Sequence, residues 1–170
     1  TTALIERAGA DGQPVRVLGD GANLLVDDDG VDGLVLSLDR LQQIEHPDAK
    51  DPGLLRVGAG ANLMRLVADT VRDGLAGLET LAGIPATLGG AIVMNAGGDF
   101  GQIADLVERV HAVTIAGQEI TLPRERIDFG YRHSGLNHLI ITAADLRLTP
   151  ASDHAALRDR LKEIMAYKKN

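Results

Sequence analysis

The pattern of apolar and polar positions along the chain predicts several short β-strands. Apolar runs of strand length occupy residues 15–18, 24–26, 31–38, 54–57 and 139–148. Residues 107–115 and 119–122 flank the turn Ala116-Gly117-Gln118, which predicts a β-hairpin. Strands and hairpins are intermixed with helical segments, so the pattern favours an α+β fold over a strictly alternating parallel sheet.

Helical spacing predicts three helices. Residues 1–8 have the pattern of the tail of an amphipathic helix, and residues 154–169 form a helix rich in Lys and Arg toward its end. The middle helix begins after Asn62 as N-cap and stops at Gly74, with apolar-face positions Leu63, Leu66, Val67, Thr70 and Val71. The first helix has no start signal and the last has no capping turn, so we expect both ends to be cut from longer elements.

Composition narrows the class of protein. The 170 residues carry a net charge of -7, and only 2% of them are aromatic, which argues against general nucleic-acid binding but not against a local basic pocket. The lack of cysteine excludes disulfides, thiolate metal sites and a cysteine nucleophile. No apolar run approaches the roughly 20 residues that span a bilayer, and no signal peptide is visible. We therefore expect a cytoplasmic protein without membrane partners; the oligomeric state is not predicted.

No metal site is expected. The five histidines are scattered without ligand spacing. The run from Asp27 to Asp29 suggests calcium, but it has no further ligands at loop spacing, so a solvated turn is the better interpretation.

The first glycine-rich segment, residues 18–26, carries a strand into Gly19-Asp20-Gly21. Glycines at such a turn let consecutive amide groups point toward one anion, such as a pyrophosphate. No third glycine opens a helix, so this is not the dinucleotide-binding fingerprint. An ordinary tight turn with Asn23 in a left-handed conformation explains the pattern equally well.

The second glycine-rich segment, residues 81–98, consists of small and apolar residues with a few polar ones. Such a backbone can approach a flat ligand closely, with amide groups and Thr87 or Asn95 supplying hydrogen bonds. The alternative is a buried loop and short helix whose glycines serve close packing. For a stretch of this length we favour the ligand.

Three blocks of sequence carry a family resemblance. They are Gly-Asp-Gly-Ala-Asn-Leu-Leu-Val at 19–26, Ala-Gly-Ile-Pro-Ala-Thr-Leu-Gly-Gly-Ala-Ile-Val-Met-Asn-Ala-Gly at 82–97, and Phe-Gly-Tyr-Arg-His-Ser at 129–134. In this order they resemble the family of UDP-N-acetylenolpyruvoylglucosamine reductases. The resemblance implies a two-lobed α+β FAD-binding fold of the vanillyl-alcohol-oxidase (PCMH) type, truncated at both ends. Residues 1–47 would form the first lobe, without its N-terminal strand, and residues 48–150 the second. Residues 151–170 would lead toward an absent substrate-binding lobe.

The same resemblance implies an activity. The family reduces bound FAD with NADPH as co-substrate and passes the hydride to UDP-N-acetylglucosamine enolpyruvate, a step in peptidoglycan synthesis. A proton-donating serine and a C-terminal glutamate of the family would lie outside this chain, so we expect the 170 residues alone not to turn over. The alternatives are another FAD oxidoreductase of the same fold and a non-catalytic flavin- or nucleotide-binding module.

The implied site residues follow from the matching blocks. The implied cofactor-binding residues are Gly19, Asp20, Gly21, Ala22, Asn23, Leu24, Gly83, Ile84, Pro85, Thr87, Gly89, Gly90, Asn95, Ala96 and Gly97. Tyr131 and Arg132 would face the substrate, and Arg132 would also be catalytic, since a fixed planar cation suits a carboxylate on which charge develops.

Three positions in the matching blocks depart from the family pattern. Ala22 stands where serine is common, and Asp20 and Ala86 stand where glycine is common. We therefore expect the Asp20 carboxylate to point away from the phosphates and Ala86 to keep a negative φ.

Overall fold

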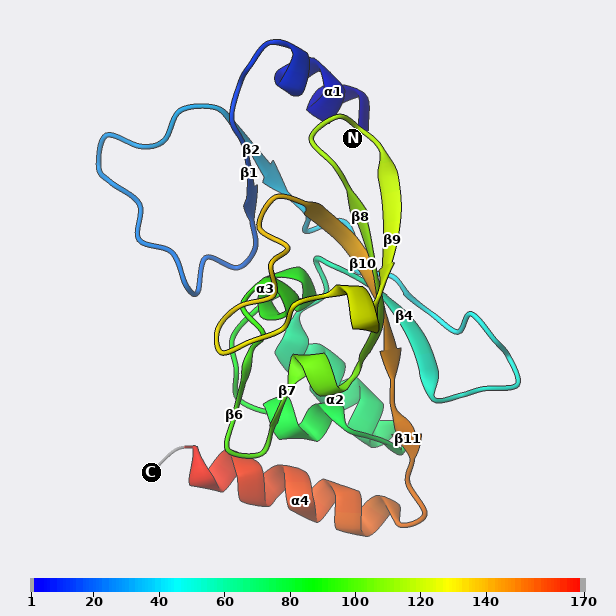
Figure 1. The fold of residues 1–170 in the computed structure, drawn as a ribbon. Helices are drawn as coiled ribbons and strands as arrows, with labels where there is room; N and C mark the ends of the chain where they lie inside the picture. Colours follow the sequence, from blue (N-terminus) through cyan, green and yellow to red (C-terminus); the bar gives the residue numbers. More distant parts are fainter. Residues whose placement is uncertain (1, 169–170) are drawn as a thin grey trace.

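The computed structural model describes residues 2–168 and is organised around a five-stranded antiparallel sheet (Figure 1). The strand order is β3 (Ile44–Glu45), β4 (Leu54–Gly58), β10 (Ile140–Arg147), β8 (Val107–Val113) and β9 (Glu119–Pro123). On one face of the sheet, Val57, Val110 and Ala144 are aligned across three neighbouring strands and are each 0% exposed. Side chains along a strand alternate between the two faces of a sheet, and these buried residues share one face. This face therefore forms part of the main hydrophobic core.

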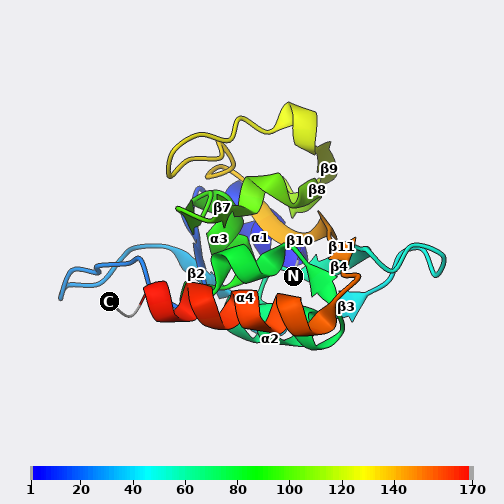
Figure 2. The same cartoon turned by 90° about the horizontal axis from the view of Figure 1, so that it is seen from below.

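Helices cover the apolar face of the sheet. They are α2 (Leu63–Arg72), the 3-10 helix η1 (Leu78–Leu81), α3 (Leu88–Val93) and α4 (His154–Tyr167). Helix α4 packs on α2 and η1, and the view from below shows it lying across α2 (Figure 2). This antiparallel sheet with its layer of helices confirms the predicted α+β class.

The predicted middle helix is confirmed at both ends. The Asn62 side chain accepts a hydrogen bond from the Arg65 amide at 3.0 Å, as an N-cap does. Gly74 follows the helix with a φ of 75°, a conformation that favours glycine and stops the helix. The amphipathic spacing was therefore sufficient to place α2.

The N-terminal part forms a separate small layer. Helix α1 (Thr2–Ala10) precedes β1 (Val15–Leu18), which pairs in parallel with β2 (Leu34–Ser37). A long loop, residues 19–33, joins the two strands and projects from the body of the molecule (Figure 1). Helix α1 lies against the tip of the β8–β9 hairpin, where a Cβ on Gly9 would come within 2.7 Å of the Ile115 carbonyl oxygen.

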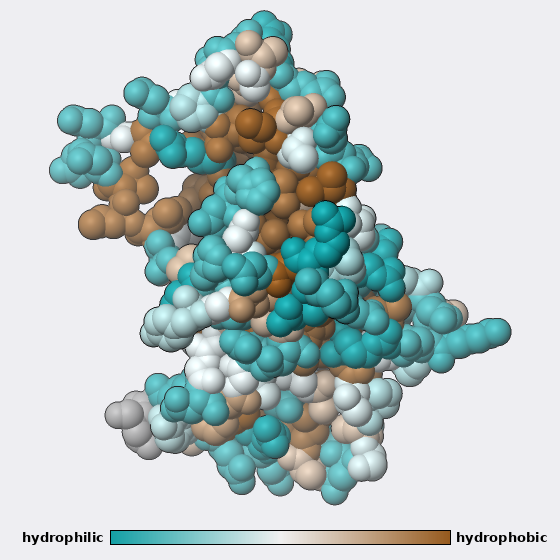
Figure 3. Space-filling view, in the orientation of Figure 1, coloured by the Kyte–Doolittle hydropathy of each residue, from teal (hydrophilic) through white to brown (hydrophobic). Residues whose placement is uncertain are grey.

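Three of the sequence predictions need correction. The predicted strand at residues 24–26 is wrong: these residues are irregular and exposed, with Leu25 100% exposed, and the projecting loop presents an apolar surface (Figure 3). An apolar run needs a pairing partner to become a strand, and the described residues place none beside it. The strand predicted at 31–38 is shorter and begins after Gly33, whose φ is 107°. Helix α1 continues through Gly9 to Ala10, beyond the predicted end at residue 8.

Short elements complete the fold. They are β5 (Leu75–Ala76) paired with β11 (Thr149–Pro150), β6 (Gly97–Gly98) paired with β7 (Gly101–Gln102), η2 (Ile103–Asp105) and η3 (Arg124–Arg126). Residues 46–53 connect the paired strands β3 and β4, so the lobe boundary predicted near residue 47 falls in a connection within one sheet. The division into lobes stays a prediction. Between residues 2 and 168 no helix has both the length and the apolar character needed to cross a membrane.

Candidate functional site

The two glycine-rich segments meet at Thr87. Gly19 lies so close to this residue that a Cβ on Gly19 would come within 2.7 Å of Thr87 Oγ1. Thr87 also forms an isolated antiparallel bridge with Asn62. Because Asn62 and Thr87 are the N-caps of α2 and α3, both helices begin beside the loop that follows β1.

The loop at residues 19–24 leaves its amide groups available. Gly21 has a φ of 71°, and the turn is closed by a hydrogen bond from the Leu24 amide to the Gly21 carbonyl oxygen at 3.3 Å. Within the described part of the chain, none of the amides of residues 20–23 donates to a backbone carbonyl. Consecutive free amides at a glycine turn are suited to binding an anion. The left-handed conformation proposed for Asn23 is wrong, since Gly21 adopts it instead.

Asp20 directs its carboxylate toward α2. Asn62 Nδ2 donates to Asp20 Oδ2 at 3.3 Å, while Asn62 Oδ1 caps the helix. The sequence contains no sign of this contact, because the two residues are 42 positions apart. It joins the loop at residues 19–24 to α2 through Asn62, which the sequence had indicated only as a helix cap.

The glycines around α3 serve two different purposes. Gly89 is buried, its amide donates to the Ala59 carbonyl oxygen at 2.8 Å, and a Cβ there would lie 3.0 Å from the Ala59 Cβ. Gly90 is exposed, and its amide is capped by Thr87 Oγ1 at 3.3 Å. The close-packing interpretation therefore explains Gly89, whereas Gly90 leaves its surface open to a ligand. Ala86 keeps a negative φ, as expected.

Asn95 uses its side chain inside the protein. Its Nδ2 donates to Gln102 Oε1 at 3.0 Å and to the Gly130 carbonyl oxygen at 2.9 Å, and its Oδ1 accepts from the Ala104 amide at 3.3 Å. The residue is buried and has a φ of 42°, a region that asparagine tolerates better than most residues. The amide that we expected to bond a ligand is thus engaged in joining three segments of the chain.

Tyr131 and Arg132 form the tip of a tight turn. Two hydrogen bonds close it, from the Gly130 amide to the His133 carbonyl oxygen at 2.9 Å and in the reverse direction at 3.2 Å. Arg132 has a φ of 53°, and its guanidinium lies 5.6 Å from the centre of the Tyr131 ring. A non-glycine residue in this region costs about 1–2 kcal/mol and often marks a functional position.

The turn is fastened to the second glycine-rich segment at two points. One is the bond between Asn95 and Gly130; the other is the Ser134 hydroxyl, which donates to the Val93 carbonyl oxygen at 2.8 Å. Ser134 is 1% exposed and was part of the matching block, but no role had been assigned to it. All three blocks that carry the family resemblance are therefore connected in space, from the loop after β1 through α3 to the Arg132 turn.

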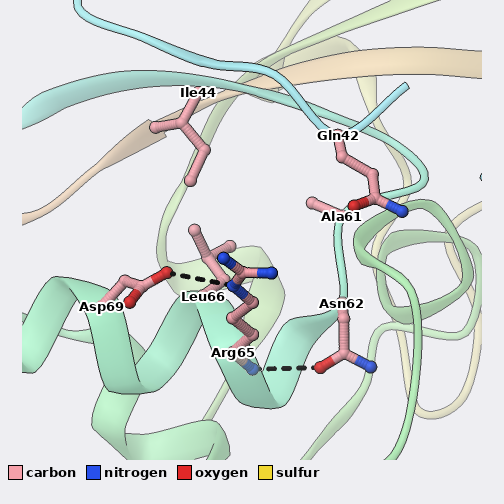
Figure 4. Close-up of a pocket in the computed structure, with 7 residues that line it drawn as sticks. All are labelled: Gln42, Ile44, Ala61, Asn62, Arg65, Leu66 and Asp69. Carbon is pink, nitrogen blue, oxygen red and sulfur yellow. Dashed lines mark hydrogen bonds and ion pairs between the residues drawn. The ribbon is translucent and has the colours of Figure 1, made fainter. Parts of the chain in front are cut away.

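A small pocket of about 180 Å³ opens beside the first turns of α2 (Figure 4). Its lining residues are Gln42, Ile44, Ala61, Asn62, Arg65, Leu66 and Asp69. Arg65 is paired with Asp69, with 3.7 Å between Nε and Oδ2. Asn62 lines this pocket and also bonds to Asp20 of the loop after β1. The sequence had indicated no binding role for the lining residues.

Several known proteins are similar to this chain. The model of a family described as FAD binding domain matches residues 2–123. A UDP-N-acetylenolpyruvoylglucosamine reductase from Synechococcus sp. (strain CC9605) is 44% identical over 161 residues, which cover 93% of this chain and 53% of that protein. One from Lactiplantibacillus plantarum is 37% identical over 172 residues, or 99% of this chain and 56% of that protein. The crystal structure of the Thermus caldophilus reductase superposes with a TM-score of 0.83 at 36% identity, covering 99% of this chain and 60% of that one.

The chain belongs to the FAD-binding domain family, the class that its fold defines. Within this class its relatives are UDP-N-acetylenolpyruvoylglucosamine reductases, which confirms both the resemblance and the FAD-binding α+β fold expected from it. The chain spans about half the length of the curated relatives it matches.

Proposed function

We propose that this chain is the FAD-binding part of a cytoplasmic, NADPH-dependent reductase that converts UDP-N-acetylglucosamine enolpyruvate to UDP-N-acetylmuramate. The observation that supports this most strongly is the joining of three distant segments: Gly19 against Thr87, and the Arg132 turn against α3 through Asn95 and Ser134. One site can therefore combine a backbone surface for the cofactor with the guanidinium of Arg132 for the substrate. The names of the relatives supply the substrate.

The residues present fit FAD. The free amides of residues 20–23 provide donors for a pyrophosphate, and Gly21 has nothing within 4 Å of a Cβ position, so a ligand can approach its backbone. Gly83, Ile84 and Pro85 would line the flavin, along with Gly90, Ala96 and Gly97. FAD, when bound, supplies two-electron chemistry, accepting a hydride from NADPH and delivering it to the substrate.

Arg132 is proposed to hold the substrate carboxylate. Its guanidinium is a planar fork that carries its charge at all relevant pH values, and it lies at the tip of an exposed turn. When a hydride adds to the enolpyruvyl group, negative charge grows toward that carboxylate, and a fixed cation stabilises the transition state more than the ground state. Tyr131, 93% exposed, lies beside the guanidinium and would cover the substrate.

The proton that completes the reduction is proposed to come from a residue outside this chain. General acid catalysis needs its donor within hydrogen-bonding reach of the reacting carbon. We propose that the serine and the glutamate implied by the resemblance belong to the half of the relatives that this chain does not span. We therefore propose that the 170 residues bind FAD but do not catalyse the complete reaction alone.

An absorbance experiment on the full-length parent protein tests the proposal. The purified protein should bind FAD and show flavin absorption bands, NADPH should bleach them, and the enolpyruvyl sugar nucleotide should restore them. A flavin that is bleached but not restored by this substrate would indicate another FAD oxidoreductase. A flavin that NADPH cannot bleach would favour the non-catalytic module, and a protein that refuses FAD would refute the proposal.

A further inference from the structure

The last turn of α4 contacts the chain just beyond the second glycine-rich segment. The Tyr167 hydroxyl donates to Asp99 Oδ2 at 2.9 Å. The Tyr167 ring stands edge-on to Phe100, with ring centres 5.1 Å apart and planes at 89°, a favourable aromatic geometry. Asp99 and Phe100 follow directly after the strand β6. The tyrosine therefore holds the C-terminal side of the proposed flavin segment, residues 83–97.

The next residue of α4 contacts the other end of the same segment. Lys168 Nζ donates to the Ala82 carbonyl oxygen at 2.7 Å. Ala82 is the C-cap of η1, and an ammonium group there satisfies a carbonyl at the negative end of a helical turn. Burial lowers the pKa of Lys168, while the Asp99 carboxylate acts to raise it, so both ends of the segment lie within the influence of one ammonium group.

Gly83 lies next to the side chains of Lys168 and Met165. A Cβ on Gly83 would be 3.6 Å from Lys168 Cδ and 3.7 Å from Met165 Sδ. Gly83 also has a φ of 77°, so its own backbone conformation is one that few residues adopt. The flavin segment therefore begins at a glycine with a left-handed backbone conformation, and the C-terminal end of α4 covers this glycine.

Helix α4 is itself firmly placed. Leu157 and Ile164 are buried against the core, and Arg160 pairs with the buried Glu79 of η1 at 3.5 Å. The core and η1 therefore hold α4 in place. The last residues of α4 contact both ends of residues 83–97, a segment that consists mostly of glycine, alanine and other small residues. Residues 83–86, which precede α3 in this segment, lie in no helix or strand and have conformational freedom to lose when they order around a ligand.

We propose that Tyr167 and Lys168 are positioning residues for the flavin: they clamp residues 82–83 and 99–100, and so hold residues 83–97 in the conformation that binds FAD. Neither side chain touches the cofactor in this proposal. The inference rests on the proposed function, because it assigns FAD to that segment. Preordering the segment reduces the entropy lost on binding, so loss of the clamp appears as weaker FAD binding.

The test uses the full-length parent protein, stripped of flavin, with FAD binding followed by fluorescence titration and the thermal midpoint measured without FAD. Lys168→Met should raise the Kd for FAD about tenfold, and Tyr167→Phe about threefold, since each removes a charge-assisted hydrogen bond that is partly exposed. Lys168→Arg keeps a cationic donor and should recover most of the affinity. Lys162→Met makes the same substitution on the same helix, in an exposed pair with Asp159, and should leave FAD binding unchanged.

The outcomes separate the two proposals. If wild type binds FAD and both clamp variants bind it equally well, the clamp is refuted and the proposed function stands. Lys168→Met could instead lower the FAD-free thermal midpoint and bind FAD normally at a low temperature at which the variant is folded. That result would show a general structural role and would also refute the clamp. A folded wild type that binds no FAD would refute both.

Discussion

Asn95 donates from Nδ2 to the carbonyl oxygen of Gly130, 2.9 Å away and 35 residues further along the chain. The bond joins the end of α3 to the turn that carries Arg132. Together with the hydrogen bond from the Ser134 hydroxyl to the Val93 carbonyl oxygen, it makes the position of the proposed substrate-binding cation depend on the position of the proposed flavin segment. A substitution at Asn95 should therefore affect both the proposed flavin segment and the turn that carries Arg132.

Asn95→Ala should lower the free energy of unfolding of the parent protein by about 2–4 kcal/mol. The substitution leaves the buried Ala104 amide without its acceptor and places an alanine at a φ of 42°. Asn95→Gly removes the same side chain but tolerates that φ, so its loss should be about 1 kcal/mol smaller. Urea unfolding of the three proteins gives the comparison. Equal losses in the two variants would mean that the backbone conformation contributes nothing.

Gly19→Ala should disturb the contact between the two glycine-rich segments. Its Cβ would lie 2.7 Å from Thr87 Oγ1, so the threonine side chain must move, at a cost of about 1–3 kcal/mol. In a Thr87→Ala background the clash is absent, and Gly19→Ala should cost less. A double-mutant cycle in the parent protein, followed by urea unfolding, measures the difference. Identical costs in both backgrounds would argue that the two residues do not touch.

Gly90→Val should prevent FAD binding without unfolding the protein. Gly90 is exposed, and the nearest atom to an added Cβ is Thr87 Oγ1 at 3.3 Å, so the fold can accommodate the side chain while a ligand against α3 cannot. Ala68→Val, at an exposed position of α2, is the matched control and should keep its flavin. Absorbance of the purified proteins gives the readout, and a yellow Gly90→Val protein would place the flavin elsewhere.

Arg132→Ala should leave FAD bound and slow the reoxidation of reduced flavin by substrate about 10²–10³-fold, the usual effect of removing a donor that stabilises developing charge. Arg132→Lys keeps the charge but loses the planar fork, and it should fall between the two. Stopped-flow absorbance of the NADPH-reduced parent protein measures the rate. Loss of flavin from Arg132→Ala, rather than slow reoxidation, would contradict the assignment to the substrate side.

Lowering the pH should reduce the free energy of unfolding, because the buried carboxylate of Asp145 becomes protonated. The Asp145 side chain is 1% exposed. Burial acts to raise the pKa of this carboxyl, but hydrogen bonds from Arg56 and His111 outweigh burial and hold the pKa below its ordinary value. A folded pKa below the unfolded one stabilises the protein above a pH of about 4, and this contribution disappears as the pH falls through the folded pKa.

Asp145→Asn separates this effect from the rest of the acid response. At pH 7 it should cost about 1–3 kcal/mol, because it removes the carboxylate from Arg56, whose side chain is itself 36% exposed. The stability difference from wild type should shrink as the pH falls below about 4. Urea unfolding at pH 7 and in acid checks this. A difference that stays constant with pH would mean that Asp145 does not titrate as described.

Local sequence patterns determined most of the secondary structure. The spacing of Leu63, Leu66 and Val67, with Asn62 before them and Gly74 after them, was sufficient to place α2 and both its ends. The β8–β9 hairpin followed in the same way from the turn at Gly117. In both cases the decisive interactions join residues a few positions apart, so the chain needs no distant partner to reveal them.

The tertiary structure alone decided how these elements cooperate. Leu24, Leu25 and Val26 look like a strand but find no partner beside them, and Asn95 looks like a ligand donor but joins Gln102, Ala104 and Gly130. The bond between Asp20 and Asn62, and the clamp of Tyr167 and Lys168 on the flavin segment, also leave no trace in local patterns. The physical reason is that hydrogen-bond capacity belongs to a residue type, whereas the partner that satisfies it depends on the path of the whole chain.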